Sequence, residues 1–170
     1  VQQGLRKLLT TLKSLPQRKS YFAYLLSSMF YRDGLNGLYA FGGIYAGGVL
    51  GLSIIQIGVF GIIAALAGAI GATIGAFADR NFGPKVVVTT CCILLILACL
   101  IVVSTTQQYA LFVVPLEAES TLPLIIFYIA GAIIGAAGGS VQAASRTLLV
   151  RQVPKEEVAE AFGLFALTGR

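Results

Sequence analysis

Hydrophobic residues along the chain fall into four long runs separated by short polar segments. The long runs cover residues 21–50, 54–78, 86–104 and 122–149, and a further run covers residues 158–170. Because a helix needs about 20 apolar residues to cross a hydrocarbon core of ~30 Å, each long run predicts a membrane span. The last run is too short to cross, so we expect the chain to be a piece of a longer polytopic protein.

Composition favours a membrane protein over a soluble domain. Apolar residues make up 57% of the chain and charged residues only 11%, whereas soluble domains carry about 25% charged residues. The net charge of +5 does not indicate nucleic-acid binding, because the basic residues gather where the apolar runs end. We therefore predict an all-α integral membrane fold, a polytopic helix bundle whose partner is the lipid bilayer, with no nucleic acid.

Basic residues mark one side of the predicted bundle. Segments 51–53 and 105–121, on the opposite side, contain no Lys or Arg and carry Glu117 and Glu119. Since Lys and Arg are enriched in cytoplasmic loops, the N-terminal segment and the loop at 79–85 are predicted to be cytoplasmic. The basic residues on that side are Arg6, Lys7, Lys13, Arg18, Lys19, Arg80, Lys85, Arg151 and Lys155.

Residues 1–19 form a separate predicted element ahead of a transmembrane domain at 20–170. Leucines at positions 5, 8, 9, 12 and 15 share one helical face, and basic residues surround it. A helix of this kind lies on the anionic inner surface of a membrane. We predict a cytoplasmic amphipathic linker helix in this segment.

The apolar runs differ in their glycine content. Run 86–104 has no glycine and many bulky branched residues, which is typical of a helix that faces lipid on most sides. Runs 54–78 and 122–149 contain G-x-x-x-G pairs, which allow close helix packing, so both are predicted to be interior helices. Glycine is also generally common in membrane helices, which is the plainer interpretation. Ser53 and Gln56 fit a capping box and predict a helix start at 54.

A charged pair interrupts the first apolar run. Arg32, Asn36 and Tyr39 lie at i, i+4 and i+7, on one helical stripe, with Asp33 at its edge. A charge in the bilayer costs at least ~2.5 kcal/mol, and an intramembrane ionisable residue is by default a functional hypothesis. Three interpretations stay open: a functional face toward a water-filled cavity, a structural contact with other helices, or a position at the membrane boundary.

A second set of polar residues lies near the end of the fourth apolar run. Gln142 and Arg146 are one helical turn apart near the predicted cytoplasmic end. Arg146 either forms part of an inner gate, by reaching Asp79 or stabilising the C-terminus of the second run, or binds a carboxylate of a transported solute. Farther along, Pro154 and the acids that follow it predict the start of the next helix.

The sequence carries little chemistry of the kind that enzymes use. Its three cysteines lie inside run 86–104, no His is present, and Asp33 is the one acid within a predicted span. We therefore predict no catalytic residue, no metal and no cofactor, and we favour a secondary transporter over an enzyme. An integral-membrane enzyme that acts on lipid head groups and a non-transporting membrane scaffold are the alternatives.

The cytoplasmic segment from Gly75 to Lys85 reads G-A-F-A-D-R-N-F-G-P-K. It resembles the signature loop of the major facilitator superfamily, with one extra residue between Arg80 and Gly83. Gly83 permits an unusual backbone angle and Pro84 suits a helix start, which predicts a tight turn. The positions that carry the resemblance are Gly75, Asp79, Arg80, Gly83 and Lys85.

Two longer stretches narrow the resemblance. Y-R-D-G-L-N-G-L-Y-A-F-G-G-I-Y-A-G-G from Tyr31, and V-Q-A-A-S-R-T-L-L-V-R-Q-V-P-K-E-E-V-A-E-A-F-G-L-F-A-L-T-G-R from Val141, are similar to the vacuole-effluxer-like branch of that superfamily. Fungal members of this branch of autophagy-related effluxers are linked to amino-acid export from the vacuole.

The resemblance implies a fold and an activity. The chain would belong to the second six-helix half of a transporter that works by alternating access, and the missing half would be a partner. The first and fourth runs would line the path of a small solute, possible amino acids included, and the third would lie outermost. We favour a bacterial inner membrane over a vacuolar one as the location.

Overall fold

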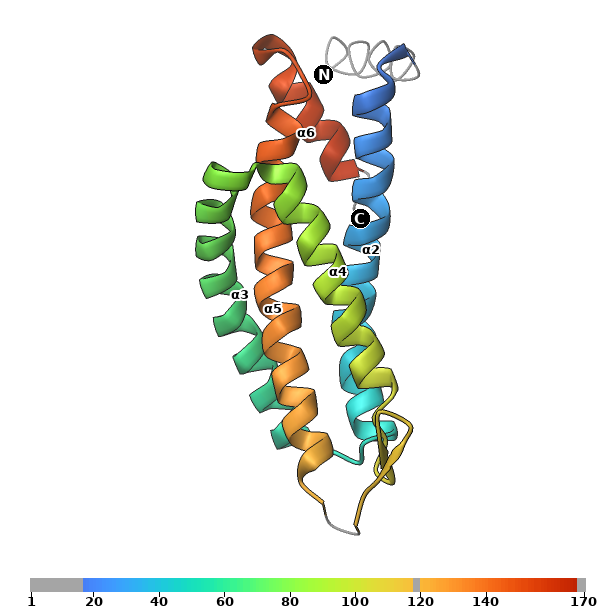
Figure 1. The fold of residues 1–170 in the computed structure, drawn as a ribbon. Coiled ribbons are helices and arrows are strands. Elements are labelled where there is room, and N and C mark those ends of the chain that lie inside the picture. The colour runs from blue at the N-terminus through green and yellow to red at the C-terminus, as the bar shows by residue number, and fades with distance from the viewer. Residues whose placement is uncertain (1–16, 118–119, 168–170) are drawn as a thin grey trace. The chain divides into compact units, whose positions relative to one another are not determined.

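The computed structural model describes residues 17–117 and 120–167, so most of the predicted linker helix at 1–19 lies outside the described residues. Four long helices dominate (Figure 1): α2 (Lys19–Gly48), α3 (Ile54–Phe82), α4 (Pro84–Val103) and α5 (Leu122–Val150). A hairpin of β1 (Tyr109–Ala110) and β2 (Val114–Pro115) follows α4, and the short η2 (Lys155–Glu157) precedes α6 (Val158–Leu167). This architecture confirms the predicted all-α class.

Three of the described helices are long and apolar enough to cross a membrane. These are α3 with 29 residues, α4 with 20 and α5 with 29. They correspond to the second, third and fourth predicted spans. The helix α2 has 30 residues, but it is the least apolar of the four long helices. A membrane crossing by α2 therefore stays a prediction, as does the domain boundary at 20.

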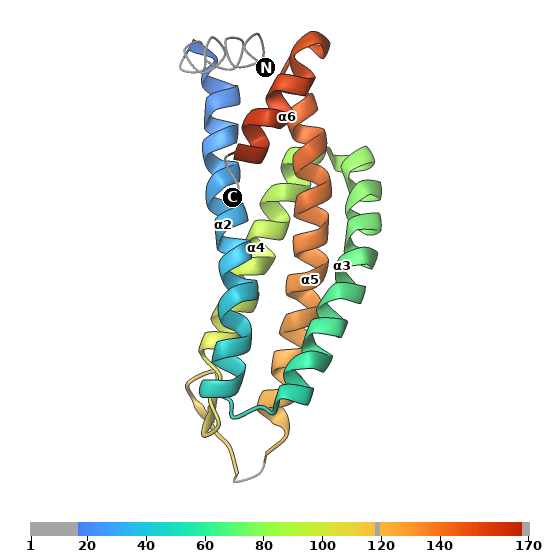
Figure 2. The same ribbon diagram turned by 180° about the vertical axis from the view of Figure 1, so that it is seen from behind.

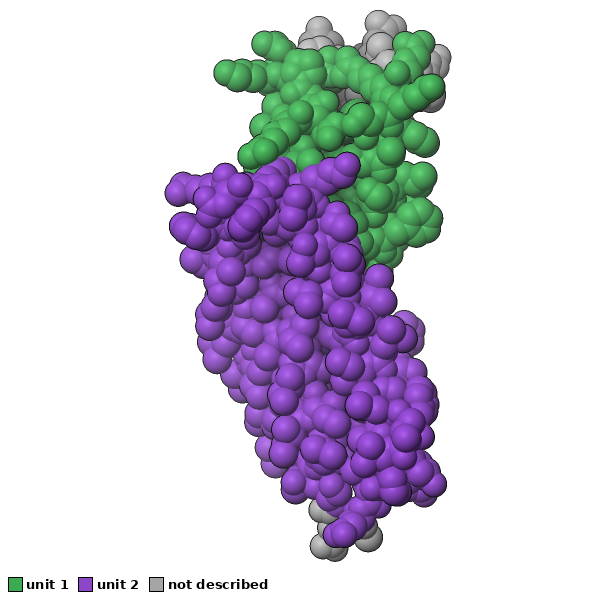
Figure 3. Space-filling view, in the orientation of Figure 1, with its two compact units in different colours: residues 1–34, 145–170 green, residues 35–144 purple. Residues whose placement is uncertain are grey.

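The chain divides into two compact units, which Figure 3 shows in different colours. Unit 1 consists of residues 1–34 and 145–170, and unit 2 of residues 35–144. The helices α2 and α5 each contribute residues to both units, because the divisions fall inside them. The two units are described separately below.

In unit 2, local signals in the sequence set both ends of α3. The Ser53 hydroxyl accepts a hydrogen bond from the Gln56 amide at 3.3 Å, and the Gln56 side chain accepts one from the Ser53 amide at 2.8 Å. This reciprocal pair confirms the predicted capping box. At the other end Gly83 has φ 85°, and its amide donates to the Asp79 carbonyl at 3.0 Å.

The predicted cytoplasmic loop is mostly helical, which corrects its boundaries. The helix α3 continues to Phe82 instead of ending at 78, and Pro84 is already the first residue of α4. Polar residues end the apolar run at 79, but they do not end the helix. Gly83 alone makes the turn, because glycine adopts a positive φ without a steric penalty.

The glycine stripes of α3 and α5 pack closely, as the G-x-x-x-G pairs predict. Figures 1 and 2 both show α3 running beside α5. A Cβ atom at Gly71 would overlap the backbone of Ala136, and one at Gly135 would overlap the backbone of Ala64. The Ser140 hydroxyl also donates to the Gly71 carbonyl at 2.6 Å. The backbones therefore meet without intervening side chains.

The prediction that α3 is an interior helix is wrong within the described residues. Only one stripe of α3 is buried, and its members are Ala64, Gly71, Gly75 and Asp79. Its bulky residues, such as Ile62, Leu66 and Ile70, lie on exposed positions. The small residues that pack against α5 occupy one face only, so α3 is one-sided. By contrast, α5 buries half of its most apolar stretch.

The helix α4 agrees with the expectation of extensive lipid contact. Its buried positions Val87, Cys91, Leu95 and Ala98 follow helical spacing along one face. Most of its other bulky side chains are exposed. All three cysteines are reduced and lie within α4, as predicted for small apolar residues in a span.

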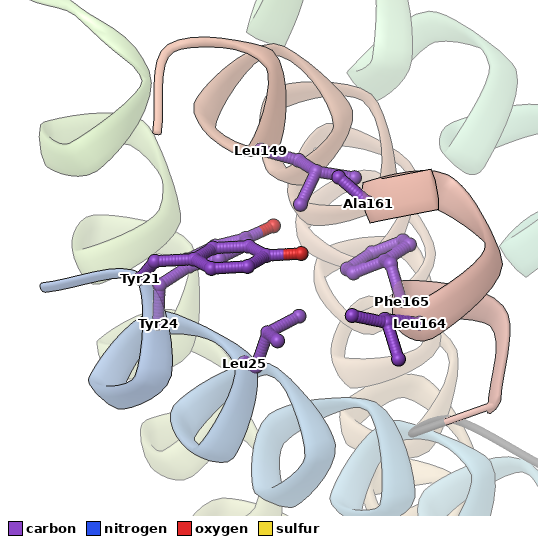
Figure 4. Close-up of a cluster of buried hydrophobic side chains, with 7 residues drawn as sticks. All are labelled: Tyr21, Tyr24, Leu25, Leu149, Ala161, Leu164 and Phe165. Atoms are coloured by element: carbon purple, nitrogen blue, oxygen red, sulfur yellow. The ribbon is translucent and has the colours of Figure 1, made fainter. Parts of the chain in front are cut away.

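Unit 1 has its own core, built from three helices (Figure 4). Tyr21, Tyr24 and Leu25 come from α2 and Leu149 comes from α5. The side chains of α6 complete the cluster, and they are Ala161, Leu164 and Phe165. Pro154 caps η2, and the acids in its first turn confirm the predicted helix start there.

Candidate solute groove and the Arg32 cluster

An open groove of about 540 Å³ lies in unit 2, lined by residues of α2, α3 and α5. Most of its lining residues are glycine, alanine or a bulky apolar residue, and none is charged. Two side chains, Tyr39 and Gln142, supply polar groups. The complete lining is Tyr39, Gly43, Ile57, Phe60, Gly61, Ala64, Ala65, Gly68, Gly135, Gly139 and Gln142.

Small residues create this groove because they leave space that longer side chains would fill. Gly68, Gly135 and Gly139 belong to the α3–α5 contact, where the backbones touch. Phe60 forms part of the wall, and its ring stacks on Phe127 with a centroid distance of 4.3 Å. A rigid wall of this kind can hold the shape of a binding site.

The two polar side chains of the groove come from helices that are far apart in the sequence, α2 and α5. Tyr39 extends from α2 toward α5, where a Cβ at Gly138 would lie 2.8 Å from the Tyr39 hydroxyl. Gln142 is exposed on α5. The phenol donates and accepts hydrogen bonds, and the amide has two donors and an acceptor. Together these two uncharged side chains can form hydrogen bonds with polar groups of a solute.

The structure brings together only part of the stripe predicted on α2. Tyr39 lines the groove with Gln142, whereas Asn36 is exposed and does not line it. Asp33 is also exposed. Their roles stay predictions.

Arg32 has a partner within unit 1. Its guanidinium donates a hydrogen bond to the Phe165 carbonyl of α6 and lies 4.2 Å above the centroid of the Phe165 ring. Of the three interpretations left open for Arg32, this placement matches a structural contact with another helix.

Tyrosines on α2 strengthen the same cluster. The Tyr24 hydroxyl donates to the Ser145 carbonyl at 2.6 Å, and the Tyr31 hydroxyl is 2.7 Å from the Ser145 hydroxyl. The sequence analysis did not identify Tyr24, Tyr31 or Phe165. The i, i+7 spacing of the two tyrosines, next to Arg32, is a signal that could have pointed to them.

The other predicted positions lie as follows. Arg146 is exposed on the part of α5 that belongs to unit 1, and Asp79 is buried in unit 2. The predicted gate contact between them joins different units and stays a prediction. Gly75 packs against Ser140, whose Cβ would be 2.7 Å from a Cβ on the glycine. Arg80 and Lys85 are exposed beside the turn at Gly83.

An ion pair outside the apolar spans makes a pH-dependent contribution to the stability of the fold. The Arg18 guanidinium donates two hydrogen bonds to the Glu157 carboxylate, one of them 2.9 Å long. These bonds lower the pKa of Glu157 below its ordinary value of 4.5. A carboxylate with a lowered pKa stabilises the fold above its unfolded pKa, and this contribution is lost as the pH falls through the folded pKa.

We expect Glu157→Gln to lower the thermal midpoint slightly at neutral pH, because surface ion pairs contribute little. The difference from the parent protein should become smaller at about pH 3, because the stabilising carboxylate is lost as the pH falls from the unfolded pKa through the folded one. Melting curves of the purified protein at both pH values measure this. Glu156→Gln, an exposed neighbour, is the control, and a Glu157→Gln difference that is undiminished in acid contradicts the assignment.

The sequence of the chain matches a known family. Residues 1–170 match the family described as "Vacuole effluxer Atg22 like". No curated protein and no solved structure matches the chain. The match covers the whole chain, and the helices long enough to span a membrane agree with a transporter family of the major facilitator type. The chain therefore belongs to the vacuole effluxer Atg22-like family of integral membrane transporters.

Proposed function

We propose that the chain is part of a secondary active transporter and that the groove in unit 2 forms part of the path of a small solute. One observation carries this proposal: Tyr39 and Gln142 line a hollow whose other walls are small or apolar. Polar side chains in apolar helices are costly unless they face a water-filled or protein interior. A solute path is the use that fits both the hollow and the family.

The chemistry of the groove fits a small solute such as an amino acid, the class that the resemblance to the fungal effluxers implies. The Tyr39 phenol and the Gln142 amide can hydrogen-bond carbonyl, hydroxyl or ammonium groups. Ile57 and Phe60 offer an apolar surface to a side chain of the solute. Neutral contacts of this kind bind weakly enough to allow release, as a transport cycle requires.

We propose alternating access as the transport mechanism. In this class of transporter two helical halves rock about a central site, so each face of the membrane is open in turn. Asp33 is exposed on α2, and we keep it as the candidate for proton or charge coupling. Arg32 contacts Phe165 instead, so we assign it to structure.

Transport by the intact protein in proteoliposomes tests the proposal. We expect Gln142→Ala and Tyr39→Phe to raise KM for the transported solute about twofold to twelvefold, because each removes one hydrogen bond of about 0.5–1.5 kcal/mol. The measurement is initial flux of a panel of labelled amino acids.

Matched control variants outside the groove distinguish a loss of solute binding from a general loss of protein function. Tyr109→Phe changes a tyrosine of similar exposure, 47% against 45% for Tyr39, and Gln108→Ala changes an exposed amide outside the groove. Both should transport normally. If the parent protein is folded but moves no solute, the transporter role is wrong. If it transports and the groove variants equal the parent, the solute path lies elsewhere.

A further inference from the structure

The hairpin between α4 and α5 presents an apolar tip. Its strands pair Tyr109 with Pro115 and Ala110 with Val114. The tip residues are large and exposed, reaching 68% for Phe112 and 79% for Val113. No charged residue occurs from 104 to 116. Water-exposed turns are normally built from polar residues, glycine and proline, so this composition calls for another environment.

The backbone of the tip is unusual as well. Leu111 and Phe112 have φ values of 54° and 62°, and the Val113 amide donates to the Ala110 carbonyl at 3.2 Å. Two consecutive positive φ values describe a tight turn that usually contains Asn and Gly. Bulky residues rarely adopt this conformation. The turn thus directs two large apolar side chains outward where small polar ones would be easier to accommodate.

Hydrogen bonds to the preceding loop hold this strained turn in place. The Phe112 amide donates to the Ser104 carbonyl at 2.8 Å, and the Leu116 amide donates to the Gln108 carbonyl at the same distance. Ser104 directly follows α4. The tip is therefore fixed against the end of a helix that is long and apolar enough to span the membrane.

The hairpin connects two helices that are each long and apolar enough to cross a membrane. It begins a few residues after α4 ends at Val103 and finishes shortly before α5 begins at Leu122. Figures 1 and 2 show it at the end of α4 away from the turn at Gly83. Exposed Leu100 and Val103 continue the apolar surface of α4 toward the hairpin. The apolar tip therefore lies next to a helix end that also exposes apolar side chains.

We propose that the tip from Leu111 to Val114 inserts into the boundary between lipid head groups and acyl chains and anchors the α4–α5 connection there. The neutral, amphipathic flank of the hairpin suits the head-group level, where tyrosine is favoured. Tyr109, Gln107 and Gln108 occupy this flank and are exposed. The apolar tip then loses its contact with water, which offsets the unfavourable backbone angles.

Tryptophan fluorescence of the intact protein in lipid nanodiscs tests this proposal. The 170 residues contain no Trp, and the difference spectrum against the parent protein removes any other source. Phe112→Trp should give blue-shifted emission that brominated lipids quench strongly and aqueous iodide quenches weakly. Val113→Trp should behave in the same way and serves as a second variant if the first does not fold.

Gln108→Trp, on the flank of the same hairpin, is the matched control. Its emission should be red-shifted and more sensitive to iodide than that of either tip variant. Strong iodide quenching of the tip variants, together with weak quenching by brominated lipids, would place the tip in water and overturn the proposal. Protection of the tip from both quenchers would show that protein covers it, which also overturns it.

Discussion

Replacing Gly71 by valine is expected to disrupt the packing of α3 on α5 more than any other single change considered for unit 2. A Cβ at this position would overlap the backbone of Ala136, and backbone atoms cannot rotate away. The hydrogen bond from Ser140 to the Gly71 carbonyl would be lost as the helices separate. Overpacking of about 1–3 kcal/mol together with the lost interhelical bond predicts a decrease in the free energy of unfolding of about 3 kcal/mol.

Gly58→Val provides the matched control for this change. Both glycines belong to α3, but a Cβ at Gly58 would meet no atom within 4 Å. Unfolding of each variant by titration with sodium dodecyl sulfate, followed by circular dichroism, compares their stabilities. Gly58→Val should match the parent protein. Equal stability of Gly71→Val and Gly58→Val would show that close helix contact contributes little here.

The second large effect is expected for Arg32→Gln. This change removes a charged donor from the Phe165 carbonyl and a cation from the face of the Phe165 ring. A hydrogen bond with a charged partner contributes about 1.5–3 kcal/mol, and a cation–π contact of a partly buried arginine about 0.5–2 kcal/mol. We expect the free energy of unfolding to fall by roughly 2–4 kcal/mol.

A double-mutant cycle with Phe165→Leu separates the two contributions. The leucine removes the ring but keeps the backbone carbonyl, so the interaction energy of the cycle measures the cation–π contact alone. We expect about 0.5–2 kcal/mol for it. Asp33→Asn, at the exposed neighbouring position, should leave stability unchanged. If Arg32→Gln keeps full stability and loses transport, Arg32 acts on the solute or its coupling instead of holding α6.

Patterns that are local in sequence predicted most of the fold. Apolar runs located the long helices, the Ser53 capping box located the start of α3, and glycine spacing predicted its contact with α5. Each of these depends on neighbouring residues and on the period of a helix. The end of α3 was harder, because the residues after 78 change from apolar to polar without leaving the helix.

Features that depend on distant partners were not predictable in the same way. The stripe on α2 grouped Arg32 with Asn36 and Tyr39, but nothing in that stripe identifies Phe165, which is far along the chain, as the partner of Arg32. Of the other residues on this stripe, Tyr39 lines the groove and Asn36 does not. The apolar hairpin lacks glycine and asparagine, the residues that usually reveal its type of turn.

The turn at Gly83 has a mechanical consequence. A single residue separates α3 from α4, so there is no spare chain to absorb sliding of one helix past the other at this end. The connection between α2 and α3 is longer, from 49 to 53. During any rearrangement of the bundle, the ends of α3 and α4 at Gly83 are therefore tethered and shift in concert, whereas the longer connections before α3 and after α4 allow neighbouring helices more freedom.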